Sequence, residues 1–280
     1  MTLLMIITLN SCRQKEKTSD MNIIYLHHSI GEVIWRGTPS LLSRIVKRIS
    51  KDLSYHLHKV EPLPILFEKY NKTNNKNYRI NEMYFPKAAT YGWNNNPYDY
   101  YNIWVKNAGN KSFMEEPTLE MLTKEYQLII FKHCTPVFNI NPDPDSAEIN
   151  SDYKSLPNYK LQYLALRDKF HEFPSTKFIL FTGAAQVQSP GMDEEAKRAK
   201  EFYEWVTDEW DLPGDNIFLW DLYGLQTEGG LYFKSNYAVS EKDSHPDAVF
   251  AGRVVKLLFN RIIDIIENNG DKTKLTGEII

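Results

Sequence analysis

Residues Asn22–Gly31 read NIIYLHHSIG, and this stretch decides the fold. Its apolar run, Ile23–Leu26, predicts a buried strand. The run ends in two histidines, a serine and a glycine, and a segment with helical spacing follows from about Ser40 to Leu53. A strand that ends in a small nucleophile and leads into a helix places that side chain at the carboxyl edge of an α/β sheet. Ser29 is therefore the first candidate for a functional residue, with a turn or cap residue as the alternative.

Apolar runs alternate with amphipathic segments along the rest of the chain, which predicts a parallel sheet with helices on both faces. The further strands are expected over Tyr78–Phe85, Tyr126–Cys134, Lys177–Gly183 and Asn216–Asp221. Helices are expected over Tyr159–Phe173, over Asp193–Trp210, and from Pro246 as a first-turn proline. Helical spacing also predicts a buried apolar face made of Leu41, Leu42, Ile45, Val46, Ile49 and Leu53, opposite a solvated basic face.

Chain length and net charge limit the classes of protein to which this sequence can belong. The 280 residues suffice for one large domain or two small ones, and no linker divides residues 21–270. We therefore expect one domain, followed by a loose tail over 271–280. The net charge of -3 gives no basic surface that would argue for nucleic acid.

The first residues have the pattern of a bacterial lipoprotein leader. A short apolar run, Leu3–Leu9, precedes Leu9-Asn10-Ser11-Cys12, which resembles a lipobox with Cys12 as the lipidated residue. Residues 1–20 are thus expected to be a signal peptide and tether, although no Lys or Arg precedes the apolar run. This predicts an exported protein that is held in the cell envelope, on the periplasmic side or the cell surface, by a lipid anchor alone. Cys134 would then have no disulfide partner.

Residues 84–104 combine eight aromatic side chains with Asn, Asp and Gly. The segment has no clean period, so we expect a long ordered loop. Aromatic faces beside amides suit sugar rings, which makes Tyr91 and Trp93 candidates for lining a sugar-binding cleft. Packing of the rings onto the body is the equal alternative.

Parallel sheets bind ligands at the carboxyl ends of their strands. This rule brings His27, His28 and Ser29 together with His133 and Cys134. One more stretch, Asp243-Ser244-His245-Pro246, lies just before the last helix. A serine nucleophile needs a base to accept its proton and an acidic group to orient that base, and His245 and Asp243 supply those types.

These residues resemble the SGNH (GDSL-like) hydrolase superfamily over most of residues 21–267: the strand-end His28-Ser29-Ile30-Gly31, the serial α/β pattern, and the late Asp-Ser-His-Pro. The resemblance implies an α/β fold, a flavodoxin-like three-layer α/β/α sandwich with a central parallel sheet. It also implies an esterase, often one that deacetylates carbohydrate. Carried over, Ser29 is the nucleophile, His245 the general base and then acid, and Asp243 the orienting carboxylate.

The chain departs from that family in three places. His27-His28-Ser29 stands where Gly-Asp-Ser is usual, Asp243 lies two residues before His245 instead of three, and Lys132-His133-Cys134-Thr135 replaces a Gly-x-Asn-Asp block. The oxyanion donors therefore stay open beyond the backbone N–H of Ser29. The candidates for the oxyanion and substrate-binding set are His28, Gly31, Gly92, Trp93, Asn94 and His133, with Asn139 as a substitute. Asp221 or Asp247 would orient His245 if Asp243 does not.

Two other function classes stay open. Histidines near one sheet edge (His27, His28, His133 and His245) would suit a metal-dependent hydrolase, although neighbours on a strand point to opposite faces. A surface glycan-binding protein without catalysis is the second. The esterase interpretation implies no cofactor and no metal, and an acylated carbohydrate or other small ester as partner.

Overall fold

The computed structural model describes residues 20–87, 92–133 and 138–280. Five parallel strands form the central sheet in the order β2-β1-β3-β4-β5. The strands are β1 (Asp20–His27), β2 (Asn77–Tyr84), β3 (Leu128–Phe131), β4 (Lys177–Phe181) and β5 (Ile217–Trp220). This is the flavodoxin-like strand order, whose reversal point lies between β1 and β3. The predicted parallel α/β sheet is confirmed.

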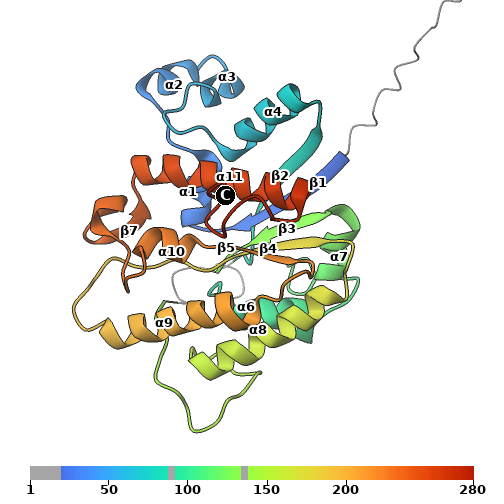
Figure 1. Cartoon of the computed structure of the whole chain (residues 1–280), viewed down its shortest axis with the longest axis vertical. Coiled ribbons are helices and arrows are strands. Elements are labelled where there is room, and N and C mark those ends of the chain that lie inside the picture. Colours follow the sequence, from blue (N-terminus) through green and yellow to red (C-terminus); the bar gives the residue numbers. More distant parts are fainter. Residues whose placement is uncertain (1–19, 88–91, 134–137) are drawn as a thin grey trace, which may run out of the picture.

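Helices cover both faces of the sheet, so the molecule has three layers. Figure 1 shows α1, α4 and α11 on one side of the sheet and α6, α8 and α9 on the other. The helices are α1 (Ile30–Arg36), α2 (Leu41–Val46), α3 (Lys51–Tyr55), α4 (Leu63–Asn74), α6 (Pro97–Tyr101), α7 (Leu119–Glu125), α8 (Leu156–His171), α9 (Asp193–Trp205), α10 (Leu222–Thr227) and α11 (Ala248–Asn268). Shorter elements are the π-helical turns η1 (Asn102–Lys106) and η3 (Val206–Trp210), the 3-10 turn η4 (Ser235–Tyr237) and an antiparallel hairpin of β6 (Ala238–Ser240) and β7 (Asp243–Pro246).

The inner strands are mostly apolar because helices cover both sides of them. All four residues of β3 are buried, as are the last five residues of β1. Their side chains join one continuous core with residues from every layer. In β1 and β3 the buried apolar run gives way to polar residues at the carboxyl end, whereas the edge strand β2 carries polar residues throughout.

The apolar face predicted for residues 41–53 is wrong as a buried face. The segment forms two short helices, α2 and α3, instead of one, and its apolar side chains are exposed: Leu41, Leu42, Ile45, Ile49 and Leu53. Helical spacing identifies such a stripe, but the described body offers no second surface to cover it. In Figure 1, α2 and α3 project beyond the layer formed by α1 and α11.

Three local expectations also need correction. The aromatic segment is partly helical, because Asn96 caps α6 with a capping box to Asp99 and η1 follows directly. The last helix begins at Ala248 with Asp247 as its N-cap, so Pro246 precedes the helix instead of opening it. The tail over 271–280 is bound to the body, since the backbone N–H of Asp221 donates to the carbonyl of Leu275. Within the described residues, no helix is long and apolar enough to cross a membrane.

Candidate active site

Ser29 occupies the turn between β1 and α1, at the carboxyl edge of the sheet. It is the N-cap of α1, but its side chain makes no capping hydrogen bond. Its backbone has φ 50° and ψ -110°, a region that side-chain-bearing residues rarely adopt. The hydroxyl is therefore free to point outward, and the residue is half-buried, so substrate can reach it.

Gly31 allows α1 to lie close against β1. A Cβ at this position would lie 2.6 Å from the Cβ of His27, closer than real Cβ atoms approach. Its backbone N–H donates to the carbonyl of His28 at 2.9 Å, and its carbonyl accepts from the Tyr25 hydroxyl. Gly31 thus fixes the turn that carries Ser29. Its N–H is already hydrogen-bonded to His28, so it is not free to serve as an oxyanion donor.

His245 and Asp243 come from β7, which packs beside α1. The Oγ of Ser29 lies 2.7 Å from Nε2 of His245, and Nδ1 of His245 lies 2.6 Å from Oδ1 of Asp243. The same carboxylate oxygen accepts the backbone N–H of His245 at 3.0 Å. These contacts, first the backbone N–H and then the ring, lower the pKa of Asp243 below its ordinary value. An ionised carboxylate on Nδ1–H leaves Nε2 as the proton acceptor that faces the serine.

The strand geometry of β7 explains why a spacing of two residues suffices. Residues i and i+2 of a strand project to the same face, so Asp243 and His245 point the same way. Ser244 points to the other face, where its Oγ accepts the backbone N–H of Val187 at 3.0 Å. This bond ties β7 to the loop after β4, and no sequence pattern predicts it.

The two fallback carboxylates have other roles. Asp221 accepts the backbone N–H of Gly224 and the hydroxyl of Thr182, so it caps α10. Asp247 accepts the backbone N–H of Phe250 and caps α11.

His27 and His28 directly precede Ser29 but have separate partners. His28 is half-buried, its Nε2 contacts the carbonyl of Pro86, and burial lowers its pKa. His27 is fully buried, and its Nε2 lies 2.9 Å from Oε2 of Glu82. Burial, assisted by the charge of Lys132, lowers the pKa of His27 to about 3, so the ring is neutral and donates to Glu82. Sequence reasoning missed Glu82, whose only signal was an acidic residue inside a predicted strand.

His133 and Trp93 are both buried in the core. His133 is buried beside the Tyr100 ring, with a ring-centroid distance of 4.5 Å, and burial lowers its pKa to about 3. Neither of its ring nitrogens has a hydrogen-bond partner among the described residues. Trp93 is only 7% exposed and its ring packs near Phe113, which favours the packing interpretation over an open sugar cleft.

Gly92 and Asn94 are both exposed, and the Asn94 side-chain amide donates to the carbonyl of Gly92 at 3.3 Å. Neither forms a hydrogen bond with Ser29, and Asn139 is likewise an exposed residue. Tyr91, Cys134 and the predicted lipidation site Cys12 lie outside the described residues.

The histidines do not gather into a metal centre in the described part of the chain, where no group of three or more His, Cys, Asp or Glu side chains is placed to hold an ion. His27 pairs with Glu82, and His245 pairs with Asp243. The ligand set expected for a metal-dependent hydrolase is therefore not assembled by these residues.

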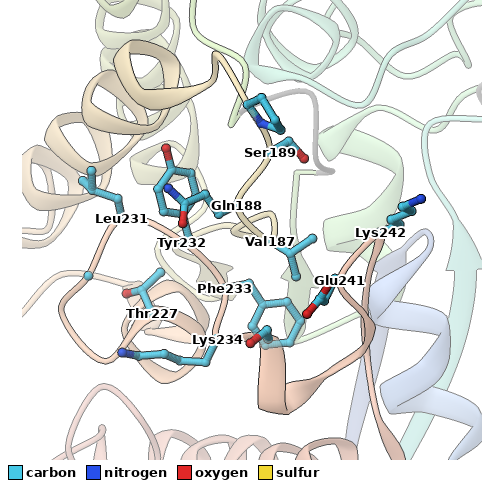
Figure 2. A pocket seen from close by; sticks show the side chains of 13 residues that line it. Val187, Gln188, Ser189, Thr227, Leu231, Tyr232, Phe233, Lys234, Glu241 and Lys242 are labelled. Carbon is cyan, nitrogen blue, oxygen red and sulfur yellow. The ribbon is translucent and has the colours of Figure 1, made fainter.

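A cavity of about 630 Å³ adjoins the β6–β7 hairpin, which carries His245. Figure 2 shows Leu231 and Tyr232 on one side of it, and Glu241 and Lys242, from the β6–β7 turn, on the other. Val187, whose N–H holds Ser244, also lines the cavity. The cavity thus combines an aromatic ring with charged groups within a few residues of Asp243.

No protein-family model matches the chain, and no curated protein matches its sequence. Among solved structures, it is similar to a carbohydrate esterase whose active site is described as displaying divergent catalytic and non-catalytic binding functions, with a TM-score of 0.35 and 15% identity. The similarity covers 87% of this chain and 65% of that chain, so this chain spans just under two thirds of that protein's length. A likeness of this size leaves function to be inferred from the site itself.

Proposed function

We propose that the protein is a serine esterase of SGNH type that removes O-acetyl or similar acyl groups from carbohydrate. One observation supports the chemistry: Ser29, His245 and Asp243 form a continuous chain of contacts of 2.7 Å and 2.6 Å at an accessible edge of the sheet. Nucleophile, base and orienting acid within hydrogen-bond distance of each other are the requirement for an activated serine.

In the first half-reaction, Ser29 Oγ attacks the ester carbonyl and its proton passes to Nε2 of His245. Asp243 remains ionised and stabilises the resulting imidazolium through Nδ1–H, as expected from its lowered pKa. The carbonyl π electrons move to the oxygen, which becomes an oxyanion. The tetrahedral intermediate then collapses: His245 returns the proton to the sugar oxygen, the ester C–O bond breaks, and an acyl group remains on Ser29.

In the second half-reaction, water attacks the acyl-enzyme while His245 accepts its proton, and the acid product leaves as Ser29 regains a proton. The oxyanion of both intermediates needs fixed donors. The backbone N–H of Ser29 has no partner among the described residues and is our first donor. The exposed Asn94 amide is the second, which requires its bond to Gly92 to be exchanged for the substrate.

The mechanism needs no cofactor. The cavity of Figure 2 is our binding site for the sugar, because Tyr232 offers a ring face and Glu241 and Lys242 offer charged groups to hydroxyls. The cavity lining includes none of Ser29, Asp243 or His245, so a glycan bound there would extend past the β6–β7 turn to present its ester to Ser29.

A fluorophosphonate probe followed by mass spectrometry tests this proposal, with label expected on Ser29. On an aryl acetate, Ser29→Ala, His245→Ala and the double variant should show nearly the same residual kcat/KM, because the two residues act as one unit. Each of these variants should lose more kcat/KM than the roughly 10²–10³-fold that is typical for removal of one oxyanion donor.

The chain offers a matched control in His171, which lies 2.8 Å from Asp215 and forms no hydrogen bond with a serine in the described part of the chain. His171→Ala should leave turnover unchanged. Absence of label on Ser29 together with retained glycan binding would instead identify a binding protein without catalysis, and metal-dependent activity that survives Ser29→Ala would identify a metallohydrolase.

A further inference from the structure

Residues 38–60 form an excursion between α1 and α4 that carries α2 and α3. Its base is closed by two backbone hydrogen bonds between Thr38 and Val60, of 3.0 Å and 3.1 Å. Between this excursion and the body lies a second cavity, of about 640 Å³. The side chains that matter for its chemistry are Trp35, Arg36, Arg44, Lys47, Lys51 and Glu82.

The cavity is positively charged. Arg36 pairs with Glu32 at 2.7 Å, but Arg44, Lys47 and Lys51 form no ion pair with any described side chain. The lining contains one acidic residue among those described, Glu82, and it is held by His27. A concave surface with one sign of charge focuses its field and attracts an ion of the opposite sign.

The acidic residues of the adjoining α4 region do not neutralise this charge. Glu61 pairs with Lys69, and Glu68 lies 3.6 Å from His56. The three cations that line the cavity therefore have no carboxylate partner among the described side chains and are available to a ligand.

A short chain of contacts links the cavity to the candidate active site. The ring of His28, next to the nucleophile, lies 5.6 Å from the ring of Tyr84. The Tyr84 hydroxyl accepts from Nη2 of Arg36 at 3.1 Å, and Arg36 lines the cavity. Tyr84 is 38% exposed, so it forms surface between the two sites. The seven residues of α1, which separate Ser29 from the far end of the helix at Arg36, span about 10 Å, a length that an oligosaccharide can bridge.

We propose that this cavity is an anion subsite that binds an acidic group of the ester substrate, so that the substrate is an acidic acylated glycan, such as one that contains uronic acid. The inference rests on the esterase function proposed above. Arg44 supplies the planar donor fork that matches a carboxylate, and Lys47 and Lys51 supply point charges. The anionic sugar is held at the cavity while another sugar of the same chain presents its acyl group to Ser29.

The test compares an acetylated uronate-containing oligosaccharide with an acetylated neutral one. For the Arg44→Gln/Lys47→Gln variant, KM for the acidic substrate should rise about tenfold or more, the effect of losing one or two charge-assisted hydrogen bonds. Its kcat and its kinetics on the neutral substrate should stay unchanged, because the cavity does not touch the reacting atoms.

Arg48→Gln/Lys59→Gln is the matched control, since it removes the same charge from exposed residues that do not line the cavity. It should change KM less than twofold. Equal losses in both double variants, or equal losses on both substrates, would overturn the proposal.

Further measurements separate failure of the subsite from failure of the esterase function. Aryl acetate turnover and probe labelling of Ser29 report on the esterase function alone. If both are absent, calorimetry with a deacetylated uronate oligosaccharide still tests the subsite, which predicts binding that weakens in Arg44→Gln/Lys47→Gln only. Because exposed Leu41 and Ile45 flank the cations, vesicles with and without phosphatidylglycerol are the last arm. Loss of vesicle binding in the variant with unchanged oligosaccharide binding would assign the anion to a lipid headgroup and overturn the proposal.

Discussion

The positive φ of Ser29 predicts measurable backbone strain at this residue. A side-chain-bearing residue held in such a region costs about 1–3 kcal/mol, and glycine avoids that cost because it has no Cβ. Ser29→Gly should therefore be more stable than Ser29→Ala. Both variants lose the contact with His245, so the difference between them reports on the backbone alone.

Glycine and alanine also differ at ordinary helix caps and in the unfolded chain, so the comparison needs a reference site. Ser155 provides it, because it is the N-cap of α8, makes no capping hydrogen bond with its side chain, and has an extended backbone with φ -121°. The preference for Gly over Ala should be about 1–3 kcal/mol larger at position 29 than at position 155.

Urea unfolding monitored by circular dichroism measures this difference. With a slope of about 3 kcal/mol/M, the predicted effect displaces the unfolding midpoint by about 0.3–1 M. Equal Gly-over-Ala preferences at the two caps would refute the strain, and Ser29 would then be an ordinary cap residue.

Other predictions concern packing, charge and targeting. Gly31→Ala should lower the unfolding free energy by about 1–3 kcal/mol through the clash with His27, and should reduce aryl acetate turnover by moving Ser29; a stable, fully active variant would contradict the packing at the turn. Burial raises the pKa of Asp99 to about 6, so the native state binds this proton more tightly than the unfolded chain does. The free energy of unfolding of the wild type should therefore fall relative to that of Asp99→Asn as pH rises from about 4 through 6, by at most about 3 kcal/mol. Urea midpoints measured across that range, if parallel for the two proteins, would exclude a raised pKa. We also propose that Cys12 is lipidated, in which case Cys12→Ala should move the protein from the membrane fraction to the soluble fraction; equal fractionation of both forms would exclude an anchor at this residue.

The sequence was informative where one physical rule dominates. Buried parallel strands must be apolar, so the strand runs and the alternation with helices predicted the sheet. The same rule places strand ends at one edge, and this allowed Ser29 after β1 and His245 before α11 to be associated across more than two hundred residues.

The expectations that failed depend on neighbours that a linear pattern does not reveal. Helical spacing over 41–53 is real, but burial needs a second surface, and Leu41 is 77% exposed. Trp93 and its aromatic neighbours suit a sugar or a core equally, and only the position of Phe113 favours the core. The tail is polar in sequence, yet its backbone carbonyls accept from Asp221 and from the Trp220 indole.

The spacing between Asp243 and His245 shows why a motif has meaning only with its conformation. In the resembled family the acid precedes the base by three residues. Taken alone, the two-residue spacing here indicates a poorer contact between Asp243 and the ring of His245. On an extended strand, however, positions i and i+2 share a face, and one carboxylate oxygen reaches both Nδ1 and the backbone N–H of His245, at 2.6 Å and 3.0 Å. The intervening Ser244 then necessarily points away, and its bond to Val187 anchors the strand from the opposite side. A shortened spacing on β7 therefore preserves the orientation of the base and adds a second bond that holds the acid ionised.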